Sequence, residues 1–513
     1  MALRLDARTA AIAVATMALA AAGGDASADP PTPPPPSSAP SSAPSPEGPS
    51  LSFDAARERL FSRSDSLAAA RSGLRASQDQ ADAVKLLGAP SVFLDAQVLR
   101  YRKTLDLSLD PAKQLVQSSV DGFLAALPDK FPSAPPGLLG QIGAGIDQQV
   151  SGALGALPGS ARLQTEETLF RPTVAALAPL YTGGLIDATR DAAKAGVRQA
   201  DAELTIAGDE ALLLLVQAYF GQQLAAQVLR VSTETRDGFD LHLRNAEKLE
   251  REGFISKAQR LQVQVARDAA ARQYERAVDQ YATARSSLAI LLREPAGVAP
   301  ATPMFVNARP IGPEREFVDA ALAGQPLLRK LDAVRDQARQ GVRAAQAAQR
   351  PSVYGFAEYN LNRGDALLVE PDWIVGLGVH YTLFSGLNRG KAVSAARQRV
   401  RQADSAVDAA RAALETAVVR ARGQAETARR QYGLLAVNIE AARESVRVND
   451  LAFREGQATA AEVVDARVAL SVAETQRAAA AYEYDLALAQ LLAASGRLAD
   501  YADYIKTADK VGP

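Results

Sequence analysis

Two hydrophobic patterns take turns along this chain of 513 residues. In short segments, apolar and polar residues alternate, which is typical of a β-strand with two unlike faces. In long segments, alanine, glutamine, arginine and glutamate dominate and proline is absent, which favours helix. The clearest alternating segment is 373–384, and the longest proline-free intervals run from Gly183 to Gly253 and from Gly386 to Gly456. We therefore expect an α+β protein in which strands lead into very long helices.

The segment 373–384 has one face that is entirely apolar, with aromatic residues near both ends. Its length suits a tilted membrane-spanning strand of about 9–11 residues. The side chains that we expect to face lipid are Trp373, Val375, Leu377, Val379 and Tyr381. Three further strands are expected at 91–106, 172–182 and 352–362, and an apolar stripe predicts a helix before the first strand of each pair, at 51–89 and at 314–349. The commoner interpretation of such alternation is a half-buried strand on a soluble core, but these strands alternate with helices too long for a compact domain.

The intervals between the glycines are very long for single helices. At 1.5 Å per residue, a helix of 70 residues would measure about 105 Å. Helices that return along 256–292 and 459–495 also lack proline. Such helices must pack against each other as coiled-coil-like hairpins, with Gly253 and Gly456 at the turns.

The two hairpins are copies of each other. Val197–Asp201 (VRQAD) recurs as Val400–Asp404, at an offset of 400 − 197 = 203 residues. Gly253 corresponds to Gly456 at the same offset, since 456 − 253 = 203. One offset without a gap indicates an internal duplication. At the same offset Leu180–Gly183 matches Leu383–Gly386, so we expect strand-to-helix joints at Gly183, Gly184 and Gly386, where a permissive backbone is needed.

The first copy carries an insertion. The segments beginning at Pro90 and Pro351 correspond, but they lie 261 rather than 203 residues apart, so about 58 extra residues fall roughly at 111–168. The insertion is rich in glycine, proline and leucine and has no counterpart in the second copy. We expect an extracellular loop between the first two strands.

Residues at the N-terminus indicate secretion. Arg4 and Arg8 precede an apolar stretch at 9–22, and Ala26-Ser27-Ala28 forms a cleavage site. The expected organisation is a signal peptide at 1–28, a Pro/Ser-rich linker at 29–50, a first repeat at 51–296, an equatorial linker at 297–313, a second repeat at 314–498 and a C-terminal tail at 499–513.

Composition narrows the function further. The net charge of −1 gives no electrostatic case for nucleic acid, and the absence of cysteine excludes disulfides and thiolate metal sites. We find no run of 18 apolar residues after the signal, so membrane entry must use strands. Four strands leave unpaired edges in lipid, and small closed barrels need about eight strands, so an oligomer is expected.

Candidate catalytic chemistry is sparse. The two histidines, His242 and His380, lie far apart, and each is expected to be a packed or strand residue. Gly386–Lys391 departs from a phosphate-binding loop in both spacing and final residue. No nucleophile–base set is found, so we expect neither an enzyme nor a bound cofactor or metal.

The order and spacing of these parts resemble the TolC-like outer-membrane efflux protein family. The resemblance spans about residues 51–500 and rests on two strand-to-helix segments and two hairpin tips, Pro179–Gly184, Thr382–Gly386, Arg251–Ser256 and Arg454–Thr459. It implies a homotrimer with a shared 12-stranded outer-membrane β-barrel and a periplasmic helical tunnel. The implied role is the passive exit duct of a tripartite efflux pump or a type I secretion system.

That resemblance also implies partners and a gate. The partners would be a periplasmic adaptor protein, an inner-membrane transporter and outer-membrane lipid, with the tips at Gly253 and Gly456 as docking points. The alternative from a different class is a soluble periplasmic coiled-coil scaffold or adaptor.

In the family, acidic side chains after the second tip glycine line a constriction. The matching residues are Glu462 and Asp465, whose spacing puts both on one helix face. Rings of carboxylates would favour cations. Phe453 stands where the family can carry a latching tyrosine, but it has no hydroxyl, and Gln259 stands where the first tip often has an acid. The alternative is that Glu462 and Asp465 are ordinary solvated charges.

Overall fold

A computed structural model describes residues 48–106, 119, 126, 162–362, 371–507 and 509–510. The signal peptide, nearly all of the Pro/Ser-rich linker and most of the 111–168 insertion lie outside the described residues, as do the expectations attached to them. Residues 46–513 form one compact unit, separate from 1–45. The description that follows concerns that unit.

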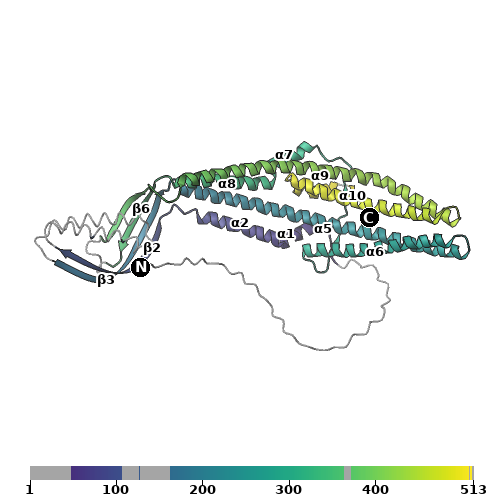
Figure 1. Cartoon of the computed structure of the whole chain (residues 1–513), viewed down its shortest axis with the longest axis horizontal. Helices are drawn as coiled ribbons and strands as arrows, with labels where there is room; N and C mark the ends of the chain where they lie inside the picture. Colours follow the sequence, from purple (N-terminus) through teal and green to yellow (C-terminus); the bar gives the residue numbers. More distant parts are fainter. Residues whose placement is uncertain are drawn as a thin grey trace, which may run out of the picture. The chain divides into compact units, whose positions relative to one another are not determined.

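Long helices make up most of the unit. Each repeat begins with two shorter helices and ends with a long hairpin (Figure 1). The first repeat contains α1 (Phe53–Arg63), α2 (Asp65–Ala83), α5 (Leu185–Arg251) and α6 (Lys257–Leu292). The second contains α7 (Glu314–Gly324), α8 (Pro326–Ala347), α9 (Arg389–Arg454) and α10 (Ala460–Ala494). The predicted hairpins are confirmed, with 67 residues in α5 and 66 in α9.

The shorter helices differ from the prediction in one respect. The sequence predicted a single helix in each repeat, at 51–89 and 314–349, and each is broken in two. Ser64 has an extended backbone and caps α2 by accepting a hydrogen bond from the Leu67 N–H. Gln325 is also extended, because the following Pro326 disfavours helical geometry at the residue before it.

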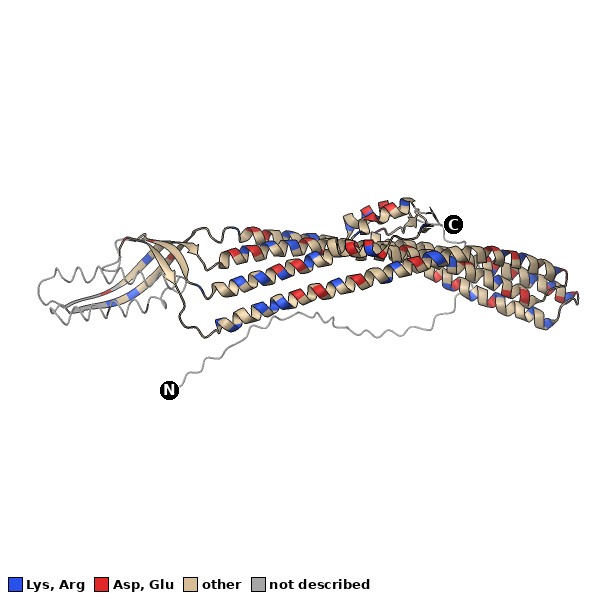
Figure 2. Cartoon of the chain, turned by 90° about the horizontal axis from the view of Figure 1, so that it is seen from above, with Lys and Arg blue, Asp and Glu red and all other residues tan. Residues whose placement is uncertain are grey.

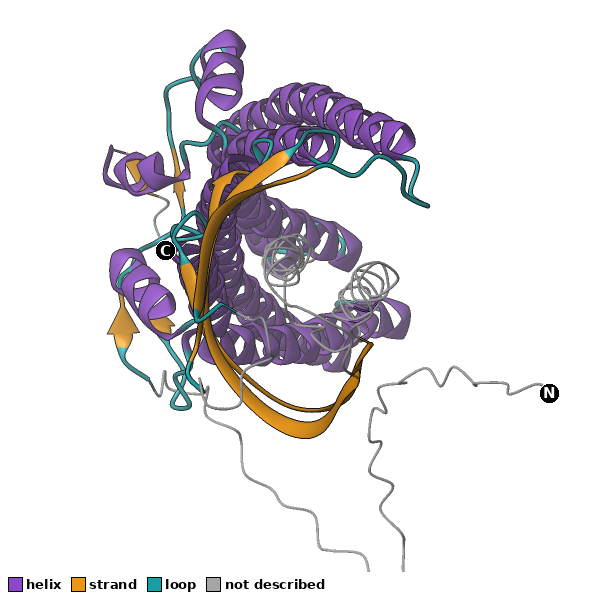
Figure 3. Cartoon of the chain, turned by 90° about the vertical axis from the view of Figure 1, so that its left-hand side faces the viewer, coloured by secondary structure: helices purple, strands orange, loops and turns teal. Residues whose placement is uncertain are grey.

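Four antiparallel strands form one curved sheet beside the helix ends (Figure 3). They are β2 (Ser91–Asp106), β3 (Arg162–Tyr181), β6 (Ser352–Asn360) and β7 (Trp373–His380), in the order β2-β3-β6-β7. The central pairing of β3 with β6 joins the two repeats. β2 and β7 form the edges of the sheet.

Two strand boundaries correct the predictions. β3 begins at Arg162 rather than 172, so the end of the predicted insertion is strand. β2 pairs with β3 from Ser91–Leu177 to Asp106–Arg162, whereas β6 pairs only with the Thr173–Tyr181 part of β3. The first hairpin therefore extends well beyond the second. β7 ends at His380, so Tyr381 follows the strand instead of lying within it.

An aromatic core packs the equatorial linker, residues 297–313, against the helices. Phe53 packs against Tyr219, Phe220 and Tyr501 with ring centroids 5.5 Å apart in each case. Tyr219 donates a hydrogen bond to the Leu51 carbonyl at 2.7 Å. Two pairs of short strands also hold the equatorial linker. β4 (Ala299–Pro300) pairs with β1 (Ser50–Leu51), and β5 (Phe305–Val306) pairs with β8 (Asp509–Lys510). The described part of the expected C-terminal tail includes η1 (Leu498–Asp500) and α11 (Tyr501–Thr507).

Charged residues of both signs are interspersed along the helices (Figure 2). Length and composition alone would allow one described helix, α5, to cross a membrane. The sequence prediction overlooked this stretch because glutamines such as Gln217 and Gln222 interrupt its apolar residues. Three of its apolar side chains, Leu215, Val216 and Phe220, are fully buried in the core, whereas Leu214 is 54% exposed.

Candidate functional site

Where all four strands pair, the outward face of the sheet is apolar and exposed. On β7 the exposed fractions are 63% for Trp373, 68% for Val375, 69% for Leu377 and 70% for Val379. Gly376 and Gly378, on the opposite face, are less exposed. The same surface continues on β2 with Val92, Leu94 and Val98, each at least 66% exposed. Such an extensive exposed apolar surface requires a partner, since soluble proteins rarely leave one uncovered.

The other face of the sheet is buried and partly polar. Its buried residues are Leu99, Leu169, Arg171, Thr173, Ala175, Phe356, Glu358 and Asn360. Arg171 Nη2 donates a hydrogen bond to Glu358 Oε1 at 2.7 Å. This apolar-out, polar-in arrangement is opposite to that of a soluble half-buried sheet and is typical of a transmembrane barrel wall.

The first strand-to-helix joint depends on glycine. Gly183 and Gly184 have φ values of +68° and +95°, which L-residues rarely adopt. A β-carbon on Gly183 would also lie 2.8 Å from the Ala347 carbonyl oxygen. Arg350 Nη1 donates to the Gly183 carbonyl at 3.0 Å, so the segment that follows α8 in the second repeat holds this joint in place.

At the second joint, side-chain hydrogen bonds stabilise the connection, and no glycine with positive φ is needed. Gly386 is not among the glycines with positive φ. Arg389 donates to the carbonyls of Ala348 at 3.1 Å and Thr382 at 2.6 Å. Asn388 caps α9 by accepting from the Lys391 N–H at 3.0 Å. The two repeats therefore stabilise the same strand-to-helix connection by different interactions.

The hairpin turns are alike in both repeats. Gly253 and Gly456 have φ values of +81° and +75°. Each turn is followed by a capping box, in which the cap side chain and the third helical side chain bond reciprocally to backbone N–H groups. The pairs are Ser256 with Gln259 before α6 and Thr459 with Glu462 before α10.

The capping box gives Glu462 a structural role. Its Oε2 accepts from the Thr459 N–H at 2.6 Å, as Gln259 Oε1 accepts from the Ser256 N–H at 2.8 Å. An amide oxygen serves as well as a carboxylate here, which explains the glutamine in the first repeat. Glu462 and Asp465 are both exposed, and within the described part of the chain Asp465 forms no ion pair. A single chain leaves both carboxylates available to an interior surface of an oligomer.

Phe453 does not occupy the expected position. The sequence grouped it with a constriction, but its side chain is only 3% exposed. It packs inside the chain against His242, with ring centroids 4.7 Å apart, because its aromatic ring fills the space between the two hairpins. In this conformation Phe453 cannot line a channel.

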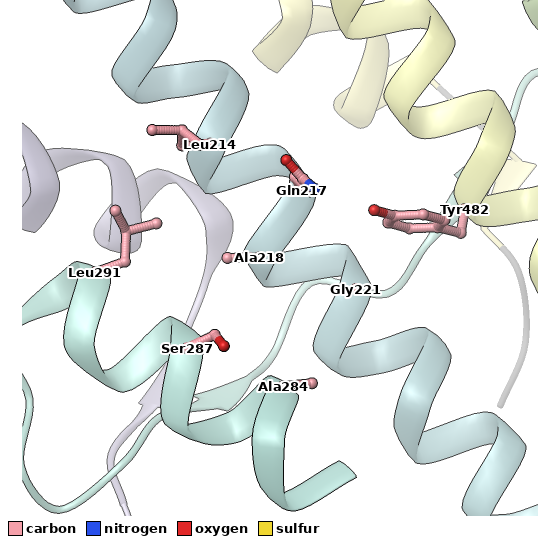
Figure 4. A pocket seen from close by; sticks show the side chains of 8 residues that line it. All are labelled: Leu214, Gln217, Ala218, Gly221, Ala284, Ser287, Leu291 and Tyr482. Carbon is pink, nitrogen blue, oxygen red and sulfur yellow. The ribbon is translucent and has the colours of Figure 1, made fainter. Parts of the chain in front are cut away.

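The pocket between α5, α6 and α10 has an uncharged lining. One pocket of about 420 Å³ lies between α5, α6 and α10 (Figure 4), where the Tyr482 ring points from α10 toward Gly221. Its lining contains no acid, base or activated nucleophile: Leu214, Gln217, Ala218, Gly221, Ala284, Ser287, Leu291 and Tyr482. Among the described residues, no group of three potential metal ligands occurs. The two features described above are the sheet with an exposed apolar face and the two hairpin tips.

Comparisons with known proteins agree with these features. Residues 317–497 match the family model of outer membrane efflux proteins. A crystal structure of a membrane protein from Pseudomonas aeruginosa has 15% identity and a TM-score of 0.66, over 86% of this chain and 93% of that one. The outer membrane protein VceC from Vibrio cholerae has 14% identity and a TM-score of 0.63, over 86% and 96%. The Campylobacter jejuni outer membrane channel CmeC has 13% identity and a TM-score of 0.64, over 89% and 90%.

No curated protein sequence matches the chain. The protein class defined by the fold is that of outer-membrane channels with a helical periplasmic tunnel. The chain resembles the TolC-like outer-membrane efflux proteins, by the family model over the second repeat and by fold over most of its length. The resemblance, fold class and outer-membrane location expected from the sequence are confirmed.

Proposed function

We propose that three copies of this chain form a passive exit duct for a tripartite efflux pump. The single observation that carries this proposal is the four-stranded sheet, which is apolar outside, polar inside and open at both edges, β2 and β7. Lipid does not tolerate unpaired edges. Three sheets of four strands close into one barrel of 12, with β7 of each copy paired to β2 of the next.

The helices supply the periplasmic part of the duct. An α5 helix of 67 residues would measure about 100 Å, far more than the roughly 30 Å of a hydrocarbon core. The turns at Gly253 and Gly456 lie at the ends of the hairpins remote from the sheet (Figure 1). This position suits docking to a periplasmic adaptor protein and an inner-membrane transporter, with gating at the same tips. A type I secretion system would use the same architecture.

Fractionation and electrophoresis test the proposal. The expected result is recovery in the outer membrane and extraction by detergent as a trimer that dissociates only on heating. A soluble monomer in periplasmic extract would instead support the scaffold or adaptor alternative. Conductance of purified trimers in a planar bilayer would then establish the duct.

A further inference from the structure

His242 lies buried where the two hairpins meet near their tips. Its side chain belongs to α5 and is 2% exposed. The imidazole packs against the Phe453 ring at the end of α9, with ring centroids 4.7 Å apart and an interplanar angle of 59°. A small apolar cluster surrounds the pair. We call this set the tip seam: His242, Ala246 and Val263 from the first hairpin, with Phe453, Ala460 and Val463 from the second.

The seam is closely fitted. Gly238 lies one helical turn before His242, and a side chain there would collide with the Arg467 guanidinium of α10. Arg467 is itself bonded to Asp450 of α9. The first hairpin therefore packs against a fixed ion pair of the second, and separating the hairpins would expose His242 and Phe453 together.

The charges around His242 do not favour an imidazolium. Arg467 and Asp450 are the charged groups that act on it from the second hairpin. On α6, Arg260 and Arg267 are paired with Glu250 at 3.0 Å and Asp240 at 2.7 Å on α5. His242 Nε2 is buried without a hydrogen-bond partner in the described structure. Burial, reinforced by Arg467 and opposed by Asp450 and by a hydrogen bond with the Ala460 backbone, lowers the pKa of His242 to about 4.

We propose that His242 is an acid-sensitive latch that holds the two hairpins together at the tip and releases them when its imidazole is protonated. This rests on the proposed function, in which the tip is the gate. A neutral imidazole fits the seam, whereas an imidazolium would be buried beside Arg467 without a hydrogen-bond acceptor at Nε2. Once the hairpins separate, water solvates the charged ring and the seam cannot re-form around it.

The difference between the pKa of His242 in the closed and in the separated tip determines how pH changes tip opening. In a separated tip the pKa of His242 returns to its ordinary value near 6.5, above the value in the closed seam. Protons therefore bind the open arrangement more strongly, and acidification between those two values favours opening. Between pH 7.5 and 5.5 the open-to-closed ratio should rise about tenfold per chain.

Thiol labelling measures seam opening without requiring channel activity. The chain has no cysteine, so Val463→Cys places a unique thiol in the seam, where the native side chain is 0% exposed. Its labelling rate would be divided by that of Gln457→Cys at the exposed tip turn, which cancels the pH dependence of thiol reactivity. In full-length trimers, the expected ratio rises about tenfold from pH 7.5 to 5.5. If Val463→Cys does not assemble, Ala460→Cys reports on the same seam.

Matched controls decide the assignment. His242→Gln should remove the pH response, while His380→Gln, which changes the only other histidine, should retain it. Asp209→Asn should also retain it: burial raises the pKa of Asp209 to about 6, but this residue lies about 50 Å away along α5. Phe453→Ala should label rapidly at both pH values. A pH-dependent ratio that persists in His242→Gln would overturn the latch, whether or not the trimers conduct.

Discussion

Arg171 of β3 donates a buried hydrogen bond to Glu358 of β6 at 2.7 Å, and this pair joins the two repeats on the inner face of the sheet. Both side chains are less than 10% exposed. β3 belongs to the first repeat and β6 to the second, so the duplicated halves are connected by charge as well as by strand pairing. A buried pair of this kind specifies register, because slipping β3 by one residue would move Arg171 to the outer face.

Breaking this pair should destabilise the sheet more than removing it entirely. Arg171→Leu removes the guanidinium that donates to the buried Glu358 carboxylate. Breaking such a buried pair typically costs about 3–5 kcal/mol, whereas replacing both members by apolar residues is often nearly neutral. The temperature at which detergent-extracted trimers dissociate should fall markedly for Arg171→Leu. It should recover in part for Arg171→Leu combined with Glu358→Leu. Equal losses in the single and double variants would show that the pair is not coupled.

The two faces of β7 should respond oppositely to arginine. Leu377 is 69% exposed on the outer face, where a mid-membrane arginine costs roughly 2–4 kcal/mol per chain. Ile374 lies on the inner face of the same strand and is the matched control. Assembly into outer-membrane trimers should fail for Leu377→Arg and persist for Ile374→Arg; the reverse order would indicate a soluble sheet. Gly378 is a poor control, because an added β-carbon would lie 2.5 Å from the Tyr354 ring.

Acidic residues at the tip should set ion selectivity. Glu462→Gln retains the capping oxygen, as Gln259 does in the first repeat, and Asp465→Asn removes a carboxylate that makes no ion pair in the described chain. The double variant should therefore form intact trimers with reduced cation preference and weaker block by multivalent cations in single-channel recordings. Unchanged selectivity would place both residues on the outer surface of the tunnel.

Substitution of Glu462 can also test the capping box of α10 separately from ion selectivity. Glu462→Ala removes the side chain that accepts from the Thr459 N–H, so one half of the capping box is lost. We expect a loss of about 0.3–1.5 kcal/mol in tip stability. Hydrogen exchange at the start of α10 should accelerate in Glu462→Ala but not in Glu462→Gln, and equal acceleration in both would rule out capping.

Asp485 should make stability decrease as pH rises. This carboxyl is fully buried in the helical core, and desolvation raises its pKa well above the ordinary value, with the Phe305 N–H opposing. A raised folded-state pKa contributes stability that is present at low pH and is lost as pH rises through the folded value. Asp485→Asn should therefore unfold at a higher temperature than the native chain at pH 8, with a smaller difference at pH 5. An equal difference at both values would mean that Asp485 is not buried as a neutral acid.

The sequence predicted the architecture because the architecture is periodic. Proline-free intervals defined α5 and α9, alternation defined β7, and a constant offset identified the repeats. The breaks at Ser64 and Gln325 were missed because a single cap residue interrupts an otherwise continuous apolar stripe; the proline after Gln325 was the available signal.

The tip was predicted less well, because its side-chain contacts join segments far apart in the sequence. Phe453 is buried by His242, which lies 211 residues earlier in the chain (453 − 242). No local pattern reveals that pairing. The capping role of Glu462 was readable from Thr459 and the three-residue spacing, but the family resemblance drew attention to its charge instead.

Cross-linking between the sheet edges tests the trimeric barrel most directly. One cysteine would replace Val379 on β7, and a second would be moved along β2 from Val92 to Val98, in a chain that otherwise has none. Oxidation in outer membranes should yield covalent dimers and trimers at matching registers, with a ladder that stops at three. A ladder that continues beyond three, or only uncross-linked monomers at every register, would contradict the shared 12-stranded barrel.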